Sequence, residues 1–421
     1  MSMGFKVWIG LALAIGLVWL IRFVVISFVG NRRPMLSSRS YAGPVPAAPR
    51  VSVLVAAKDE EENIETCVRT LLDQDYPNYE VIAIDDRSSD RTPRILSALK
   101  AEFSSRLIVV TVSHLREGWF GKNNAMREGV AAATGDWLLF IDADCRQTSR
   151  RTVSMAMHEA RARETDFLSV IPVLETHEIW ERVIQPVCAL ILIVWFLPSR
   201  VNNPHKKAAY ANGQFMLLSR RCYDGIGGHE RVRTQLNEDI RMAQNAKAEG
   251  WRLRVVENRD LYRTRMYRTP REAWRGWSRI YAGSLGTVPR VIAAITVLFM
   301  FSVLPWASLL SSLSGVMLSP DPTADAFRRV AWCWSAAVAL QQMTLWRLYG
   351  MLQMPRSWSF AYVGGALAAL GILFSALLKT MGLSSTTWRG TTYHGNRVAS
   401  ASKTPMISDA PAPVPTSSPA D

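Results

Sequence analysis

Residues 135–145 constrain this chain most, because they form an apolar run that ends in two carboxylates, Asp142 and Asp144. An apolar run of this length predicts a strand buried on both faces of a parallel sheet. Strand side chains alternate between faces, so residues two apart can converge at the carboxyl end, where open α/β sheets bind ligands. Paired carboxylates are hard oxygen donors that favour Mg²⁺ or Mn²⁺ over zinc. The alternative is a surface loop with two solvated acids.

Strand-like and helical runs alternate from residue 51 to about residue 170. We expect strands at 51–57, 79–84, 106–112, 136–141 and 167–171, and helices at 62–73, 90–102, 123–133 and 150–163. This alternation predicts a doubly wound α/β domain. Acidic residues follow the first, second and fourth of these strands, so the strand ends should form one polar crevice.

Five short motifs follow in a fixed order: Asp59-Glu60, Asp85-Asp86, Gly121-Lys122, Asp142-Ala143-Asp144 and Glu238-Asp239. In this order and spacing they resemble the motifs of the family 2 glycosyltransferases, whose nucleotide-sugar-binding domain has the GT-A fold. The resemblance covers roughly residues 50–290. It departs from the family at Asp59, where the usual residue is Asn, and at Ala56, where it is Pro.

The resemblance implies a nucleotide-sugar donor and a divalent cation, Mg²⁺ or Mn²⁺. By that resemblance Glu60 and Asp86 contact the nucleoside, Lys122 lies near the diphosphate, and Asp142 and Asp144 hold the nucleotide and its metal. The candidate donor-binding residues are Asp59, Glu60, Asp85, Asp86, Lys122 and Asp142, and the candidate metal ligands are Asp142 and Asp144. A lysine at the diphosphate would stabilise the negative charge that grows on the leaving group. The alternative interpretation of Lys122 is a solvated lysine in the first turn of a helix.

Glu238 and Asp239 come directly before a helical stretch at 240–249. Acids are favoured at a helix start by the helix dipole, which is the structural alternative. An acceptor hydroxyl is a poor nucleophile until a carboxylate removes its proton. With the family resemblance, we expect Asp239 to be the catalytic base and Glu238 to be a second catalytic residue.

The acceptor side is expected in two further segments. Residues 212–220 resemble the acceptor-side strand of the family, which makes Asn212 and Gln214 candidates. Residues 251–290 contain ten arginines and only three acids. Within them Arg271, Arg275 and Arg279 form one stripe of a helix, and Trp274, Trp277 and Tyr281 form another. Aromatic rings beside arginines predict an interfacial amphipathic helix. Arg275, Arg279 and Trp277 are the candidates on this helix for the acceptor or the diphosphate.

Two family motifs bear on the product. Processive members carry Gln-x-x-Arg-Trp near residue 275, whereas this chain has Arg-Glu-Ala-Trp-Arg-Gly-Trp at 271–277. That departure argues against a polysaccharide synthase. Trp388 and Arg389 begin a run that resembles the Trp-Lys/Arg-Gly-Arg-x-Tyr motif that bacterial lipid glycosyltransferases carry beside the active site.

Apolar segments at 5–29, 291–318, 330–354 and 357–378 are long enough to span a bilayer. Residues 183–197 are apolar over only about half that length, which predicts a core or interfacial segment. Four arginines and no acid between residues 31 and 50 place the following domain in the cytoplasm by the positive-inside rule. A cleaved signal peptide is the alternative for the first segment. Three later crossings would put the tail outside, away from the motif at Trp388, so the topology stays open.

The net charge of +14 is compatible with nucleic acid, an anionic membrane or a phosphorylated substrate, and the apolar segments favour the membrane over nucleic acid. Five scattered cysteines predict neither a disulfide framework nor a zinc site. The expected organisation is a transmembrane helix (1–30), a basic Pro-rich linker (31–50), a catalytic domain (51–270), an interfacial helix (271–290), transmembrane helices (291–383) and a motif with a disordered tail (384–421).

These features predict a multi-pass, membrane-bound inverting glycosyltransferase of the cytoplasmic membrane. It would move one sugar from a UDP-linked donor to a lipid acceptor, as bacterial enzymes of hopanoid, carotenoid and ceramide-like glycosylation do. The alternatives are a processive polysaccharide synthase, a catalytically inactive nucleotide-binding scaffold and a transporter subunit. Retention of Asp142, Asp144 and Asp239 argues against an inactive scaffold. Apart from Lys6 at the start of the first segment, only Arg22 and Arg347 are charged within the apolar segments, which argues against a transporter.

Overall fold

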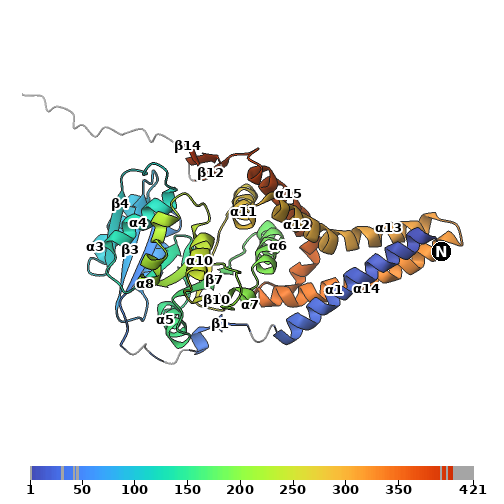
Figure 1. Ribbon diagram of the computed structural model, residues 1–421, viewed down its shortest axis with the longest axis horizontal. Coiled ribbons are helices and arrows are strands. Elements are labelled where there is room, and N and C mark those ends of the chain that lie inside the picture. The colour runs from blue at the N-terminus through green and yellow to red at the C-terminus, as the bar shows by residue number, and fades with distance from the viewer. Residues whose placement is uncertain are drawn as a thin grey trace, which may run out of the picture.

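The protein has an α/β domain at one end and a group of long helices at the other (Figure 1). The computed structural model describes residues 2–29, 33–40, 43, 47–388, 391–394 and 397–401, and describes the side chains of these residues apart from 29 and 386–401. Helices α1, α13 and α14 project away from the α/β domain, whereas α6, α11, α12 and α15 lie between the two parts (Figure 1).

Within the described residues, eight strands form the main sheet in the order β1-β10-β7-β9-β5-β2-β3-β4. Their bounds are β1 Met35–Leu36, β10 Leu253–Asn258, β7 Phe167–Ile171, β9 Phe215–Ser219, β5 Trp137–Asp142, β2 Val51–Ala57, β3 Tyr79–Asp86 and β4 Leu107–Val112. Neighbouring strands run parallel except β9, which is antiparallel to both β5 and β7. The five strands expected from the sequence are confirmed. Strands β1 and β10 were not predicted, and β1 brings part of the expected linker onto the edge of the sheet.

Helices cover both faces of this sheet, as the doubly wound prediction requires. Val53 and Val55 of β2 pack with α2, α3 and α5, whereas Leu54 points to the opposite face and packs with α4, α8 and α10. This alternation is the two-residue period of a strand that is buried on both sides. The helices are α2 Ile64–Leu72, α3 Thr92–Glu102, α4 Gly121–Ala132, α5 Thr152–Ala162, α8 Arg220–Gly225, α9 Gly228–Arg231 and α10 Glu238–Ala248.

A second sheet of three short strands lies beside the main one, in the order β6-β11-β8. Its strands are β6 Cys145–Gln147, β11 Tyr262–Thr264 and β8 Val173–Leu174. β6 starts directly after Asp144 and pairs antiparallel with β11. The chain therefore turns away from the main sheet at the two acids, which leaves their side chains at its carboxyl edge.

Among the described residues, four segments are long and apolar enough to cross a membrane: Met3–Phe28, Ile179–Val201, Val288–Leu318 and Arg356–Thr380. The first segment is α1 (Met3–Val29), and the second consists of α6 (Ile179–Trp195) and α7 (Pro198–Val201). The third consists of α12 (Val288–Leu298), a π-helical turn (Phe299–Val303) and α13 (Leu304–Leu318). The fourth consists of a 3₁₀ turn (Arg356–Ala361) and α15 (Tyr362–Thr380). Three of the segments predicted to span the bilayer, at 5–29, 291–318 and 357–378, are among these four.

Two expectations about the apolar segments were wrong. The segment at 183–197 is longer than predicted, because the charged residues Glu181 and Arg182 before it belong to the same helix, α6. Conversely, the predicted span at 330–354 lies in α14 (Thr323–Met351), which is not among the four. Gln341, Gln342 and Arg347 make this helix more polar than a lipid-exposed span. It packs instead along α1 and α13.

Helices α6 and α15 pack closely through a glycine. A Cβ on Gly365 would lie 2.2 Å from the backbone oxygen of Val183, so only glycine permits this approach. Small residues at such crossings are typical of helices that associate in membranes.

The C-terminal residues form a third sheet of β12 Thr386–Trp388, β13 Thr391–His394 and β14 Arg397–Ala401. Trp388 ends β12, and Arg389 lies outside the described residues. A disordered tail was expected after the motif within 384–421, but residues 397–401 form a strand. Residues 402–421 lie outside the described part of the chain.

Candidate active site

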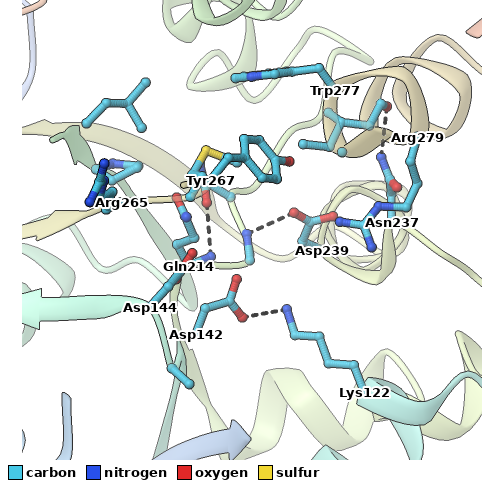
Figure 2. Close-up of a pocket in the computed structure, with 18 of the residues that line it drawn as sticks. Lys122, Asp142, Asp144, Gln214, Asn237, Asp239, Arg265, Tyr267, Trp277 and Arg279 are labelled. Carbon is cyan, nitrogen blue, oxygen red and sulfur yellow. Dashed lines mark hydrogen bonds and ion pairs between the residues drawn. The ribbon is translucent and has the colours of Figure 1, made fainter. Parts of the chain in front are cut away.

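A cavity of about 730 Å³ opens at the carboxyl ends of β2, β3 and β5. Its walls come from the loops after these strands, the first turns of α4 and α10, the segment before β9, and the helices α6 (Ile179–Trp195) and α11 (Pro270–Leu285). Figure 2 shows Lys122, Asp142, Asp144 and Asp239 around one space, with Tyr267, Trp277 and Arg279 on its far side. The fold thus brings together five motifs that are up to 180 residues apart (59 to 239).

Lys122 joins two of the predicted motifs. Its ammonium nitrogen lies 2.7 Å from Oδ1 of Asp142 and 2.7 Å from Oε1 of Glu238. Burial alone would lower the pKa of Lys122, but the two carboxylates raise it well above its usual value. Burial opposes the charged form of Glu238, yet the ammonium of Lys122 lowers the pKa of this carboxyl. Lys122 is therefore a fixed positive charge at the base of the cavity.

Asp239 is the carboxylate best placed to accept a proton. Its Oδ2 accepts a hydrogen bond from the backbone N–H of Gly213 at 2.8 Å, and its Oδ1 accepts one from the N–H of Ile240 at 2.7 Å. Burial and the charge of Glu238 raise the pKa of Asp239 to about 7. A Cβ on Gly213 would lie 3.2 Å from both Oδ2 of Asp239 and Nζ of Lys122, so glycine allows these groups to meet.

Asp142 and Asp144 lie in the same cavity, with Glu60 nearby. Burial, Asp142 and Glu60 together raise the pKa of Asp144 to about 7. Like charges held this close repel each other, and a cation would relieve that repulsion. Among the described residues, no three His, Cys, Asp or Glu side chains are grouped to hold a metal ion alone. An ion here would need oxygens from a substrate or from water as well.

The nucleoside end of the cavity is built by the loops after β2 and β3. Asp59 accepts hydrogen bonds from the backbone N–H and hydroxyl of Ser89, at 2.7 and 3.1 Å, which ties the two loops together. Glu60 accepts from the side-chain amide of Asn63 at 2.8 Å. Asp59, Glu60 and Asp86 line the cavity, whereas Asp85 is not among its lining residues. Asp85 instead accepts a hydrogen bond from the N–H of Ser88.

Arg87 is a neighbour of this region that the sequence analysis missed. Its guanidinium donates to both oxygens of Asp86, at 2.7 and 2.9 Å. Arg87 has a left-handed backbone with φ of +57°, which turns its side chain back onto the preceding carboxylate. A Cβ on Gly121 would lie 2.9 Å from Oδ2 of Asp86, so the glycine of the Gly-Lys motif makes room for this pair. The sequence signal that could have identified Arg87 is its position directly after the Asp-Asp motif.

Asn212 and Gln214 also line the cavity, beside the start of β9. Oδ1 of Asn212 accepts a hydrogen bond from the backbone N–H of Gln214 at 2.9 Å. The side-chain amide of Gln214 donates to the hydroxyl of Thr264 at 3.1 Å. The two side chains therefore shape the wall between the main sheet and the small one.

The aromatic stripe of α11 faces other helices, which corrects the expectation that it lies against lipid. Trp277 is 3% exposed, and its indole N–H donates to Oε1 of Gln185 at 2.7 Å. Tyr281 is fully buried and donates to the backbone oxygen of Cys188 at 3.0 Å. Trp274 is 40% exposed and donates to the hydroxyl of Ser375 at 2.9 Å. The stripe therefore joins α11 to α6 and α15.

Three predicted residues of α11 do reach the cavity: Arg275, Trp277 and Arg279 line it. Gln185, their neighbour on α6, was missed, although it is a lone amide within an apolar run. Trp388 ends β12, where its side chain is not described, and Arg389 lies outside the described residues. These two residues therefore stay predictions.

Residues 52–223 match the model of the family described as Glycosyl transferase family 2. The 4,4'-diaponeurosporenoate glycosyltransferase of Staphylococcus aureus (strain USA300) is 24% identical over 296 residues, which are 70% of this chain and 74% of that protein. The mannosyltransferase PcManGT of Pyrobaculum calidifontis, solved with GDP-Man and Mn²⁺, is similar with a TM-score of 0.49 and 17% identity over 89% of this chain and 99% of that one. A glucosyl-3-phosphoglycerate synthase of Mycobacterium tuberculosis, solved with Mn²⁺ and UDP-glucose, has a TM-score of 0.37 and 18% identity over 57% of this chain and 79% of that one.

The match over residues 52–223 includes strands β2, β3 and β5 and four of the five motifs, whereas Glu238-Asp239 lies beyond it. Residues 52–223 therefore form a domain of glycosyl transferase family 2, and in the described part of the chain four helical segments could cross a membrane.

Proposed function

We propose that this protein is a membrane-bound, inverting glycosyltransferase that transfers one sugar from a nucleotide diphosphate sugar to a lipid acceptor. One observation carries the proposal: the cavity that contains Asp239, Lys122 and Asp142 also has an apolar wall made by α6. A polar site for a charged donor and an apolar site for an acceptor chain therefore adjoin the same carboxylate.

Asp239 is the base in this reaction. Its pKa of about 7 allows it to be ionised in the resting enzyme and to accept a proton from the acceptor hydroxyl. The acceptor oxygen then forms a bond to the anomeric carbon while the bond to the diphosphate breaks on the opposite face. The electron pair of the broken bond leaves with the diphosphate, and one displacement inverts the anomeric configuration.

Lys122 stabilises the leaving group. Asp142 and Glu238 hold its ammonium in place, so no reorganisation is needed as negative charge develops on the diphosphate. Arg275 and Arg279 of α11 line the same cavity and add positive charge on its far side.

A divalent cation, Mg²⁺ or Mn²⁺, fits the residues present. Asp142 and Asp144 would hold it, and the repulsion between the carboxylates of Asp142, Asp144 and Glu60 supports this assignment. Such an ion, when bound, supplies positive charge that neutralises the diphosphate.

The donor is expected to be UDP-linked, with Glu60 and Asp86 at the nucleoside. The lipid acceptor is supported by the four apolar helices and by the S. aureus relative, which is named for 4,4'-diaponeurosporenoate. The basic stretch at 31–50 supports a catalytic domain on the cytoplasmic side of a multi-pass protein.

The proposal is tested by incubating membranes that contain the protein with a panel of labelled nucleotide sugars and extracting the lipids. We expect one nucleotide sugar to label the organic phase. Label in a water-soluble polymer would favour a processive synthase, and no turnover of any donor would favour a nucleotide-binding scaffold.

A further inference from the structure

We propose that the hydrocarbon of the acceptor lies along one face of α6, on a stripe formed by Ala189, Leu192, Ile193 and Phe196. This inference rests on the proposed function and specifies how that same site selects its acceptor. It assigns Leu192 and Ile193 as the residues that determine which acceptor chains fit.

Three of these four residues share one face of α6. Leu192 and Ile193 follow Ala189 by three and four residues, which is helical spacing, and Phe196 directly follows the end of the helix at Trp195. All four line the cavity, and all are half-buried. At 1.5 Å per residue, the stripe is about 10 Å long. This length fits a run of about eight methylene groups, each about 1.25 Å along an extended chain.

The two ends of the stripe meet polar groups of the active site. At one end Phe196 stacks on Tyr210 with ring centroids 5.1 Å apart, and Tyr210 lines the same cavity as Asp239. Burial raises the pKa of Tyr210, and the charge of Asp239 raises it further. At the other end Gln185 is held by the indole N–H of Trp277. A chain on the stripe therefore has its reactive end near the base.

The chemistry of the stripe selects hydrocarbon. Residues 186–198 contain no charged side chain, and Leu352 and Met354 add further apolar surface to the cavity. A sugar polymer would leave its hydroxyls without hydrogen-bond partners along this wall, whereas an alkyl or polyene chain would not.

Exposed apolar side chains at the two ends of α6 give the acceptor a route from the bilayer. Ile179 and Val194 of α6 are 67% and 43% exposed, and Leu197, just beyond the end of the helix, is 41% exposed. The same helix is one of the four that could cross a membrane, and it lies between the α/β domain and α15 (Figure 1). An acceptor in lipid therefore needs only to pass around one helix to reach the cavity.

The test compares two neighbouring positions of α6 in the full-length protein. Ile193→Trp fills the stripe, and Val194→Trp places the same ring on the exposed face as the matched control. Each variant is purified in detergent, checked for an unchanged melting temperature, and reconstituted in phosphatidylcholine vesicles that contain a total lipid extract of the source organism. Transfer of labelled sugar to the organic phase is measured at increasing amounts of extract.

Ile193→Trp should raise the apparent KM for the extract at least about tenfold, because the ring occupies the space of several methylene groups. Val194→Trp should stay within about twofold of the wild type. If Ile193→Trp does not fold, Ile193→Ala serves instead: it removes three carbons from the contact and should raise the apparent KM about 5- to 20-fold with little change in kcat.

An unchanged KM in both Ile193 variants, or an equal loss in Val194→Trp, would overturn the assignment of the stripe while leaving lipid glycosylation in place. A wild-type protein that turns over donor but labels no lipid would contradict the proposed function itself, and the stripe would then have no acceptor chain to bind.

Discussion

The backbone N–H of Gly213 donates a 2.8 Å hydrogen bond to Oδ2 of Asp239. This bond links the segment before the antiparallel strand β9 to the first turn of α10, so the main sheet and the helix jointly fix the carboxylate. The other oxygen accepts from the N–H of Ile240. Both donors leave the remaining lone pairs of Asp239 available to the cavity.

Replacing Asp239 with Asn should lower turnover about 10²- to 10⁴-fold, because the amide keeps the shape but cannot accept the proton. Binding of the donor nucleotide should persist, since the proposed partner of Asp239 is the acceptor hydroxyl and not the donor. Turnover and nucleotide affinity are measured on the same preparation. Wild-type turnover in Asp239→Asn would place the base elsewhere.

The rate should depend on pH through Asp239. Burial and Glu238 raise its pKa to about 7, so the protonated, inactive form accumulates as the pH falls below 7. We expect kcat/KM to fall about tenfold per pH unit below that value and to level off above it. The residual activity of Asp239→Asn should lack this acidic limb. A wild-type limb near pH 4 would show that the ionisation of Asp239 does not control the rate.

Removal of divalent ions should abolish turnover, and Mg²⁺ or Mn²⁺ should restore it. The reason is the mutual repulsion of Asp142, Asp144 and Glu60, which a bound cation relieves as it neutralises the diphosphate. Activity is measured after EDTA treatment and after addition of each metal. Asp144→Asn should need a higher metal concentration for half-maximal activity, and full activity in EDTA would exclude the metal role.

Gly365→Ala should destabilise the contact between α6 and α15. Its Cβ would lie 2.2 Å from the backbone oxygen of Val183, and a backbone atom cannot move aside as a side chain can. We expect a loss of about 1–3 kcal/mol, measured as a lower melting temperature in detergent. Gly364→Ala is the control, because its Cβ would have its nearest neighbour at 4.0 Å. Equal melting temperatures for the two variants would contradict the close packing.

Local patterns in the sequence were enough to predict the α/β domain. β2 and β5 are buried on both faces, and their apolar runs end where Asp59 and Asp142 begin the functional loops. The acids and Lys122 could therefore be assigned to one edge of the sheet. Their pairing could not, because the contact of Lys122 with Glu238 depends on where α10 packs, more than 100 residues later in the chain (122 to 238).

The membrane-proximal helices were harder to predict for the same reason. A helical pattern shows that Trp277 and Tyr281 share a face of α11, but it does not show whether that face meets lipid or another helix. The partners are Gln185 and the backbone of Cys188, which lie more than 90 residues earlier. Glu181 and Arg182 interrupt the apolar pattern near the start of α6, so the helix that lines the acceptor side was predicted too short.

The configuration of the glycosidic bond in the product tests the account most directly, because it reports the displacement that Asp239 is proposed to drive. The lipid product formed from an α-linked UDP-sugar is isolated and its anomeric proton is examined by NMR. A β-linked glycolipid is predicted, since the acceptor attacks from the face opposite the diphosphate. An α-linked glycolipid would contradict a single displacement with Asp239 as its base.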